Sequence, residues 1–244
     1  MRVNILSVGF DNVTLEEASE IGMEYIRTGK KAMVVTPNAE IGLECLKNPQ
    51  LNDLVNSAQL VLPDGVGVVY AAKILKKHIK GKVAGVDFAE ELVKNMAREK
   101  RSLFLFGGKP GVAEQAASRL SQKYPGLFIA GALNGYFDDE EPIIEQINKS
   151  GADALFVCLG CPKQEYFMHR NFERLNVKLM AGLGGSLDIF SGNSQRAPDI
   201  FVKLGLEWFY RLAKEPKRIK RMARLPLYLV YALKSKYKGE KQDA

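Results

Sequence analysis

The chain of 244 residues is poor in residues that bind metal ions or form covalent cross-links, with three cysteines and two histidines. Three cysteines cannot build a disulfide framework, and the CxxC spacing of Cys158 and Cys161 has no second pair beside it. His78 and His169 are the only imidazole ligands, so a zinc site is not expected. The cysteines are predicted to be free thiols, buried or in loops, in a reducing cytosol.

Long hydrophobic runs are absent from the C-terminal part, where the longest, 225–233, covers nine residues. A helix that spans a bilayer needs about 20. Met1, Arg2 and Val3 lead directly into strand-like sequence, without the basic and apolar regions of a secretory signal. The sequence therefore predicts a cytoplasmic protein that is not integral to a membrane.

Two nucleotide-binding signatures are missing as well, the GxGxxG of dinucleotide enzymes and the GK[ST] of P-loops. The turn 106–111 reads Phe-Gly-Gly-Lys-Pro-Gly instead and leads from a predicted strand into a predicted helix. Bare backbone amides at Gly107 and Gly108, with Lys109 beside them, would suit a phosphate. Glycine required only by the geometry of the turn is the alternative, and both interpretations stay open.

Apolar segments rich in β-branched residues alternate along the chain with amphipathic segments of helical period. Strands are predicted at 3–8, 32–35, 60–62, 103–106, 127–130, 154–159 and 178–181. Helices are predicted at 15–28, 67–77, 89–98, 112–122, 142–150 and 164–174. This alternation predicts an α/β fold, with a doubly wound, mostly parallel Rossmann-like sheet that is covered on both faces.

Polar side chains follow two of these strands at the edge where such folds bind ligands. Strand 32–35 is followed by Thr36 and Asn38. After strand 60–62 comes Asp64, the only carboxylate at the end of a buried strand that is followed directly by a glycine. All three are candidates for a ligand site, and N-capping of the next helix is the alternative role for each.

Two further strand-to-helix turns, 159–165 and 181–188, place Gln164 and Gly184 at the same edge. Each turn taken alone is explained equally well as an ordinary loop. Three glycine-rich turns gathered on one rim favour a pocket. The acidic run 138–141 is interpreted as the first turn of a helix, whose dipole it complements, in preference to a metal site.

The last 49 residues, 196–244, contain 13 basic and 5 acidic side chains, whereas residues 1–195 contain 22 basic and 23 acidic ones. The chain is therefore predicted to divide into an α/β catalytic body, 1–195, and a basic helical appendage, 196–244. Segregated charge of this kind indicates an anionic partner, such as a membrane surface, a nucleic acid or a phosphorylated ligand. No nucleic-acid-binding motif accompanies it, so nucleic acid is not expected.

An amphipathic helix is predicted at 199–213, and Pro216 breaks or restarts it. If the helical phase continues across Pro216, one cationic stripe forms from Arg211, Lys214, Arg218 and Arg221. Tryptophan and tyrosine side chains between these charges prefer a water–lipid interface, and each basic residue adds about 1 kcal/mol near an anionic leaflet. A solvated helix face is the alternative.

Nine segments occur in the order expected of one family, and together they are very specific: 36–40, 62–67, 83–87, 106–111, 134–137, 160–165, 184–188, 196–198 and 206–216. On these motifs the chain resembles the WecG/TagA/CpsF glycosyltransferases (glycosyltransferase family 26) from about Val3 to Arg224. It is most similar to the TagA-type enzymes of wall teichoic acid synthesis.

The resemblance implies transfer of N-acetylmannosamine from UDP-N-acetylmannosamine to undecaprenyl-diphosphate-linked N-acetylglucosamine, with inversion and without a metal ion or other cofactor. It also implies a peripheral protein on the inner face of the cell membrane. The donor sugar is not fixed, because UDP-N-acetylmannosaminuronic acid and UDP-glucose are alternatives within the resemblance. Self-association is left open.

Inverting transfer needs a base for the acceptor hydroxyl, and Asp64 is the residue expected to act as that base. The resemblance places Thr36, Asn38 and Gln164 along the pocket. It also places three arginines over the pocket, where they would offset the charge of the leaving UDP: Arg211, Arg218 and Arg221. Lys82 stands where the family usually has arginine, so the bidentate fork for a phosphate is lost there.

Two rival functions remain at this point. A nucleotide-binding oxidoreductase is suggested by the sheet and its glycine-rich turns, but the missing GxGxxG counts against it. A non-catalytic membrane-binding scaffold is suggested by the appendage alone, and it would leave Asp64 without a role.

Overall fold

The computed structural model describes residues 1–203, 205–214 and 224–242. In this part of the chain six strands form one parallel sheet in the order β4-β3-β8-β7-β5-β6. The strands are β3 (Ala32–Val35), β4 (Leu60–Val61), β5 (Ser102–Gly107), β6 (Phe128–Leu133), β7 (Ala154–Cys158) and β8 (Leu179–Gly182). The predicted α/β class and its parallel sheet are confirmed.

The predicted strand 3–8 is wrong. The N-terminal segment instead forms an antiparallel hairpin of β1 (Arg2–Ile5) and β2 (Val8–Asp11), separate from the main sheet. Leu6 adopts a positive φ of 56° between them, which turns the chain back on itself. The Arg2 guanidinium fixes the hairpin, because it binds Asp11 at 3.2 Å and donates to the carbonyl of Asn56 at 2.7 Å.

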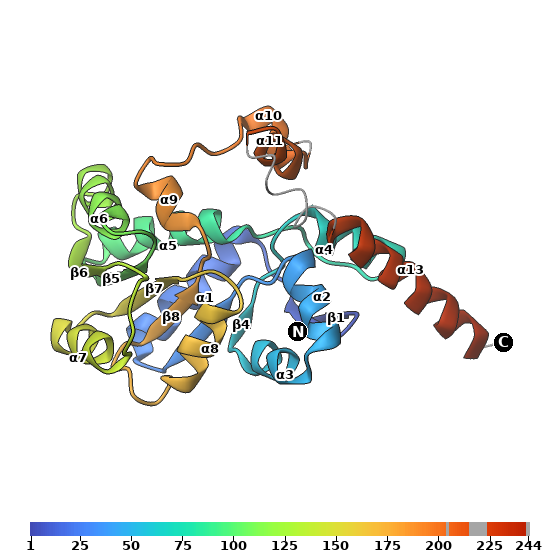
Figure 1. Ribbon diagram of the computed structural model, residues 1–244, viewed down its shortest axis with the longest axis horizontal. Helices are drawn as coiled ribbons and strands as arrows, with labels where there is room; N and C mark the ends of the chain where they lie inside the picture. Colours follow the sequence, from blue (N-terminus) through green and yellow to red (C-terminus); the bar gives the residue numbers. More distant parts are fainter. Residues whose placement is uncertain (204, 215–223, 243–244) are drawn as a thin grey trace.

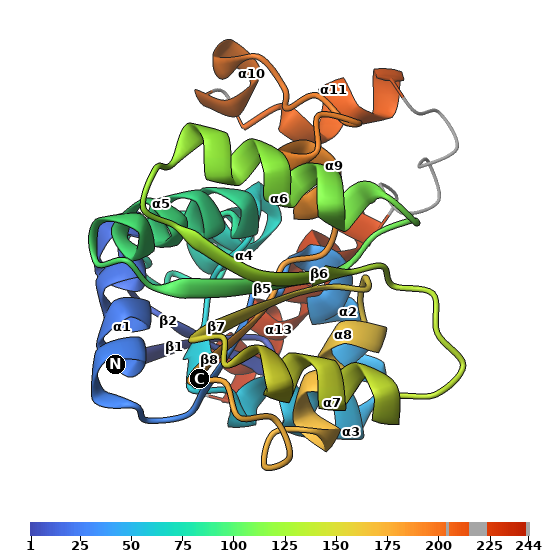
Figure 2. The same cartoon turned by 90° about the vertical axis from the view of Figure 1, so that its left-hand side faces the viewer.

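Helices cover both faces of the main sheet, and Figure 2 shows α5 and α6 on one side of the strands and α7 and α8 on the other. The first layer contains α1 (Leu15–Thr28), α5 (Gly85–Arg98), α6 (Val112–Lys123) and α9 (Ser186–Phe190). The second contains α2 (Ala39–Lys47), α3 (Pro49–Ser57), α4 (Val66–Ile74), α7 (Glu141–Ser150) and α8 (Lys163–Arg170).

Side-chain alternation along β3 explains why the molecule has two cores. Ala32 and Val34 pack into the cluster with α1 and α5, whereas Met33 and Val35 pack into the cluster with α2 and α8. Successive residues of a strand point to opposite faces, so an all-apolar strand requires a layer on each side. The carboxyl ends of the strands are left as the rim where polar turns can gather.

The basic appendage contains α10 (Asp199–Lys203), α11 (Glu207–Lys214) and α13 (Arg224–Gln242). The predicted continuous helix 199–213 is wrong, because Gly205 adopts a φ of +72° between two separate short helices. Figure 1 shows α10 and α11 beyond α9, and α13 lying beside α4 and extending away from the body. None of the helices described is long and apolar enough to cross a membrane. The division at residue 195 stays a prediction.

Gly107 is the position where the sheet tolerates a side chain least. Its φ is +136°, and an added β-carbon would lie 2.3 Å from the carbonyl oxygen of Cys158 on the neighbouring strand β7. We expect Gly107→Ala to lower the free energy of unfolding by about 3 kcal/mol, measured by urea titration. Gly29→Ala is the control, since Gly29 has a φ of +71° with open space around it, and should cost about 1 kcal/mol. Equal costs at the two sites would contradict the expected clash.

Candidate active site

Three turns at the rim of the sheet are tied together through their backbones. The amide of Leu62 donates to the carbonyl of Val35 at 2.9 Å, and the amide of Asp64 donates to that of Pro37 at 3.3 Å. The amide of Val83 then donates to the carbonyl of Pro63 at 2.9 Å. The turns that follow β3 and β4 and the segment before α5 therefore form one connected patch.

Thr36 and Asn38 lie on this patch in different roles. The Thr36 hydroxyl is buried and donates to the carbonyl of Gly182 at 3.0 Å, which ties the end of β3 to the end of β8. Asn38 is the N-cap of α2, where its side-chain oxygen accepts from the amides of Glu40 at 2.9 Å and Ile41 at 3.2 Å. The capping alternative is thus confirmed for Asn38 and wrong for Thr36.

The residue at the N-cap position of α4 is Gly65 and not Asp64, and Gly65 forms no side-chain cap. Gly65 adopts a φ of +80°, and an added β-carbon would lie 3.9 Å from the β-carbon of Asn38. The half-buried Asp64 carboxyl group therefore lies at the rim beside the Asn38 turn, as the sequence predicts for a group that acts on a ligand.

Lys82 connects this patch to the appendage. Its ammonium lies 3.7 Å from the carboxylate of Glu207, the first residue of α11. Arg211 belongs to the same helix four residues later, and its side chain is not among those described. Arg218 and Arg221 lie outside the described residues. The structure thus brings the start of α11 to the rim, while the roles predicted for the three arginines stay predictions.

Gln164 and Gly184 lie at the ends of the central strands. The side-chain oxygen of Gln164 accepts from the amide of Gly184 at 2.9 Å, and its side-chain nitrogen donates to the carboxyl oxygen of Glu165 at 2.8 Å. The side chains of Gln164 and Glu165 are buried, and burial raises the pKa of Glu165 above its usual range. The orientation of the Gln164 amide group is therefore fixed from two sides.

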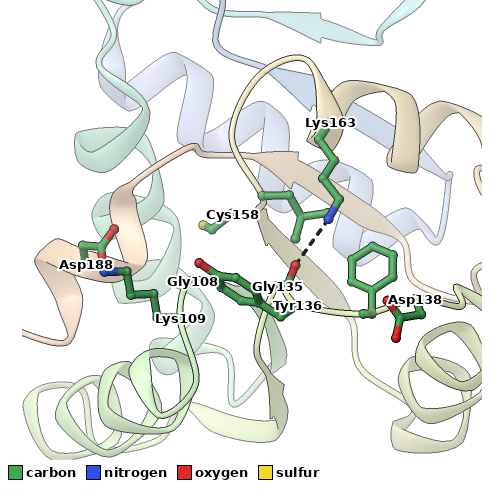
Figure 3. A pocket seen from close by; sticks show the side chains of 10 residues that line it. Gly108, Lys109, Gly135, Tyr136, Asp138, Cys158, Lys163 and Asp188 are labelled. Carbon is green, nitrogen blue, oxygen red and sulfur yellow. Dashed lines mark hydrogen bonds between the residues drawn. The ribbon is translucent and has the colours of Figure 1, made fainter. Parts of the chain in front are cut away.

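A cavity of about 570 Å³ opens at the other end of the rim, over β5, β6 and β7. Its lining includes Lys109, Tyr136, Phe137, Lys163 and Asp188. Figure 3 labels four of these side chains around it, Lys109, Tyr136, Lys163 and Asp188. Gly108 and the neighbouring Lys109, both considered for phosphate contact from the sequence, are among the residues that line it. The predicted residues therefore surround the Asp64 patch more than they surround this cavity.

Lys163 makes two contacts at the cavity. Its ammonium donates to the carbonyl of Gly135 at 3.3 Å and lies 4.2 Å from the centre of the Phe137 ring. Phe137 in turn packs on Phe106 and Phe167, at ring-centre distances of 5.4 and 6.3 Å. The Lys163 ammonium and the exposed Tyr136 ring both line the cavity. Together they suit a ligand that contains a phosphate and a flat base.

The sequence did not identify this cation, because the turn 159–165 taken alone is explained equally well as an ordinary loop. The segments 134–137 and 184–188 are motifs of the resemblance, but the sequence assigns no chemical role to Tyr136, Phe137 or Asp188 within them. The usable signal was their position directly after β6 and β8. The ring contact that immobilises Lys163 depends on side chains far apart in the sequence.

The glycine-rich turn after β5 differs from its expected form. Gly107 belongs to β5 itself, and the amide of Gly108 donates to the carbonyl of Cys158 at 3.2 Å, so this amide is not bare. The turn bends over β7 instead, and the carbonyl of Gly108 accepts from the amide of Gly135 at 2.8 Å. The geometric role of the glycines is therefore established. Gly108 also lies on the cavity wall, and its contact with a ligand stays a prediction.

The remaining candidates for metal binding have structural partners. Glu140 is the N-cap residue of α7 and pairs with Arg170, and Glu141 pairs with Arg174. The predicted acidic first turn is confirmed for Glu141 alone, because Asp138 and Asp139 precede the helix. All three cysteines are free thiols. Within the described ranges, no three His, Cys, Asp or Glu side chains are grouped closely enough to hold a metal ion.

Comparisons with known proteins give one consistent result. A family model described as the glycosyl transferase WecG/TagA/CpsF family matches residues 3–242. A protein of Bacillus subtilis (strain 168) is 39% identical over 211 residues, which cover 86% of this chain and 82% of the relative. One from Bacillus spizizenii is 38% identical over 216 residues, covering 88% and 84%. One from Staphylococcus aureus (strain MRSA252) is 33% identical over 243 residues, covering 98% and 95%.

All three relatives carry the same name, N-acetylglucosaminyldiphosphoundecaprenol N-acetyl-beta-D-mannosaminyltransferase. The matches span almost the whole of this chain and most of each relative. The similarity therefore includes both ends of the rim, the Asp64 patch and the cavity beside Lys163.

The buried carboxyl group of Glu165 gives a pH-dependent prediction. Because burial raises its pKa in the folded state, the folded protein keeps a proton that the unfolded chain has lost, so stability falls as pH rises from about 4.3 through the folded pKa. Glu165→Gln keeps an oxygen acceptor for Gln164 and has no charge to bury. Its urea midpoint should exceed that of the wild type at pH 8, and the difference should shrink towards pH 4.

The control for the loss of a carboxylate is Glu145→Gln, an exposed position on α7. A Glu165→Gln midpoint below that of the wild type at pH 8 would contradict the assignment of a costly buried charge.

Proposed function

The chain belongs to the WecG/TagA/CpsF family of glycosyl transferases, and we propose that it transfers N-acetylmannosamine from UDP-N-acetylmannosamine to undecaprenyl-diphosphate-linked N-acetylglucosamine. The names of its relatives support this acceptor and this sugar. The observation that carries the proposal is the placement of Asp64 and of the cavity beside Lys163 on one rim of one parallel sheet. One end offers a base and the other offers cations.

The donor would lie along the rim, with its nucleotide in the cavity. Tyr136 offers a flat ring to the base, Lys109 and Lys163 offer charge to the diphosphate, and Asp188 offers a carboxylate to ribose hydroxyls. Strands β8 and β7 separate β3 from β5, so about 14 Å lies between them at about 4.8 Å per strand. An extended nucleotide sugar would place its sugar near Gln164 and the Asp64 patch.

In the proposed reaction the acceptor hydroxyl oxygen attacks the anomeric carbon as the Asp64 carboxylate takes the hydroxyl proton. The bond between that carbon and the diphosphate oxygen breaks on the opposite face, which inverts the configuration. UDP leaves with the electron pair of the broken bond. Lys163 and Lys109 stabilise the charge that develops on it, and the predicted arginines Arg211, Arg218 and Arg221 would add to them.

A metal-free mechanism requires that these cations do what a divalent ion does in other transferases. Lys163 suits this task because Phe137 and the Gly135 carbonyl hold its ammonium in place before the donor binds. Lys82 is a second cation near the rim, and the carboxylate of Glu207 lies beside it. We therefore propose that the enzyme works in the presence of a chelator.

The membrane-facing surface would be the outer side of α13. Its exposed apolar side chains follow the helical period and are interleaved with Lys234 and Lys236; they are Leu227, Val230, Tyr231, Leu233 and Tyr237. Apolar and aromatic side chains flanked by lysines suit the interface of an anionic leaflet. The acceptor named for the relatives is lipid-linked, which supports a peripheral enzyme that lies on the membrane.

Asp64→Asn tests the base. We expect turnover, measured as UDP release from UDP-N-acetylmannosamine with a lipid-diphosphate N-acetylglucosamine acceptor and a chelator, to fall by about 10²- to 10⁴-fold. The thermal unfolding midpoint should stay within a few degrees of that of the wild type. Asp53→Asn, which removes an exposed carboxylate from α3, is the matched control and should keep full turnover. Full turnover by Asp64→Asn would remove the base assignment.

Replacing Leu227 and Val230 together by glutamine tests the membrane surface. We expect the affinity for vesicles rich in phosphatidylglycerol to fall about tenfold, because a loss of roughly 1.4 kcal/mol of apolar burial changes an equilibrium by that factor. Phe128→Gln is the matched control, since Phe128 is exposed on the edge strand β6, away from α13. An affinity that depends on salt but not on Leu227 and Val230 would show attraction by charge alone.

A further inference from the structure

Helix α13 packs on the two helices that begin at the Asp64 patch. It lies against α2, which starts directly after Asn38, and against α4, which starts directly after Gly65. Figure 1 shows α13 beside the α2 and α4 end of the molecule, away from α6 and α7. A helix from the far C-terminal part of the sequence therefore covers the first turns of two helices that carry predicted site residues.

Leu225 occupies the point where all three helices meet. A β-carbon added to Gly67 would lie 2.5 Å from a terminal methyl carbon of Leu225 and 2.8 Å from the β-carbon of Ala39. Gly67 belongs to the first turn of α4, three residues after Asp64, and Ala39 is the first residue of α2. The contact between the two catalytic turns and α13 has no room for a further atom.

Tyr228 makes the second contact, one helical turn further along α13. Its ring is fully buried on Gly42 of α2, where an added β-carbon would lie 2.7 Å from a ring carbon. Within the described part of the chain, the buried Tyr228 hydroxyl has no hydrogen-bond partner. The ring is therefore positioned by shape, and the glycine is needed to admit it.

Ion pairs fix the start of α13 on the same helix. The Arg224 guanidinium lies 3.1 Å from the carboxylate of Glu40 and 2.9 Å from that of Glu44. All three side chains are partly exposed, so these pairs add orientation more than stability. The packing of Leu225 and Tyr228 supplies most of the holding force.

The N-cap residue of α4 is Gly65, which has no side chain that could accept from the first amides of the helix, and the Asp64 amide donates to the Pro37 carbonyl at 3.3 Å. The packing of Leu225 on Gly67 is a further contact that holds this first turn.

We propose that α13 positions the active site, with Leu225 and Tyr228 holding the first turns of α4 and α2 and, through them, Asp64 and Asn38. The proposal rests on the proposed function, in which Asp64 is the base. The outward face of the same helix carries Leu227 and Val230, so contact with a membrane and the position of the base depend on one rigid element. Leu225 and Tyr228 are positioning residues that need not touch a substrate.

Two variants release the helix in different ways. Gly42→Ala adds a methyl group that collides with the Tyr228 ring, and Tyr228→Ala removes the ring. Tyr228→Phe is the conservative variant, because it keeps the ring and removes only the unpartnered hydroxyl. Gly22→Ala, in the middle of α1, controls for replacing a helical glycine, since its nearest neighbours are the flexible end of Leu92 and the Phe88 ring.

The first measurement is amide hydrogen exchange, which does not require activity. In Gly42→Ala and Tyr228→Ala, exchange should accelerate in residues 225–237 and also in residues 62–72, while β5 and β7 stay protected. The second is turnover of a short-chain, water-soluble acceptor without vesicles. There kcat should fall on the order of 10²-fold, as expected for a base displaced by about 1 Å, and Tyr228→Phe and Gly22→Ala should match the wild type.

Faster exchange in 225–237 with no change in 62–72 would overturn the proposal, and so would full turnover of the soluble acceptor by a variant whose α13 is released. Either result would make α13 a membrane anchor only. If β5 and β7 lose protection in both variants, Leu225→Ala provides the same comparison with a smaller cavity. A wild type without any turnover would refute the proposed function, while the exchange in residues 62–72 would still decide the positioning role.

Discussion

The constraint on which this structure depends is that a parallel sheet must be buried on both faces. Strands such as β3 and β7 are apolar throughout, so helices have to cover each side and every connection has to return across the sheet. As a result all carboxyl ends open on one rim. Thr36, Asp64, Gly108 and Gly184 come from four different strands, and the direction of the chain alone brings them to the same edge.

In the proposed function, the base and the cations that act on the diphosphate lie at different ends of the rim. Asp64 lies at the end near β4, and Lys109 and Lys163 lie near β5 and β7. In the proposed function the lysines near β5 and β7 are therefore available for the diphosphate, while Asp64 acts on the acceptor hydroxyl. The buried pair of Gln164 and Glu165 stands between the two ends and supplies rigidity without a second exposed charge.

The sequence predicted what depends on local pattern and missed what depends on distant contacts. The strands of the sheet, the Asn38 cap and the place of Asp64 follow from periodicity and turn residues. The N-terminal hairpin was missed because Leu6 has no sequence signal for a positive φ. The break at Gly205 was missed because apolar spacing continued across it. Lys163 gained its role only through the ring of Phe137, which comes from the turn after another strand.

Helix α13 shows why amphipathic period alone could not assign the appendage. Leu225, Tyr228 and Ala232 form one apolar stripe that is docked on the body, and Leu227, Val230 and Tyr231 form a second that is exposed. A helix that only anchored the protein would need the second stripe and no glycines opposite it. Gly42 and Gly67 are small where Tyr228 and Leu225 enter, so the body is shaped to receive this helix. In the proposed function, contact with the membrane and the position of the Asp64 turn therefore depend on opposite sides of the same helix.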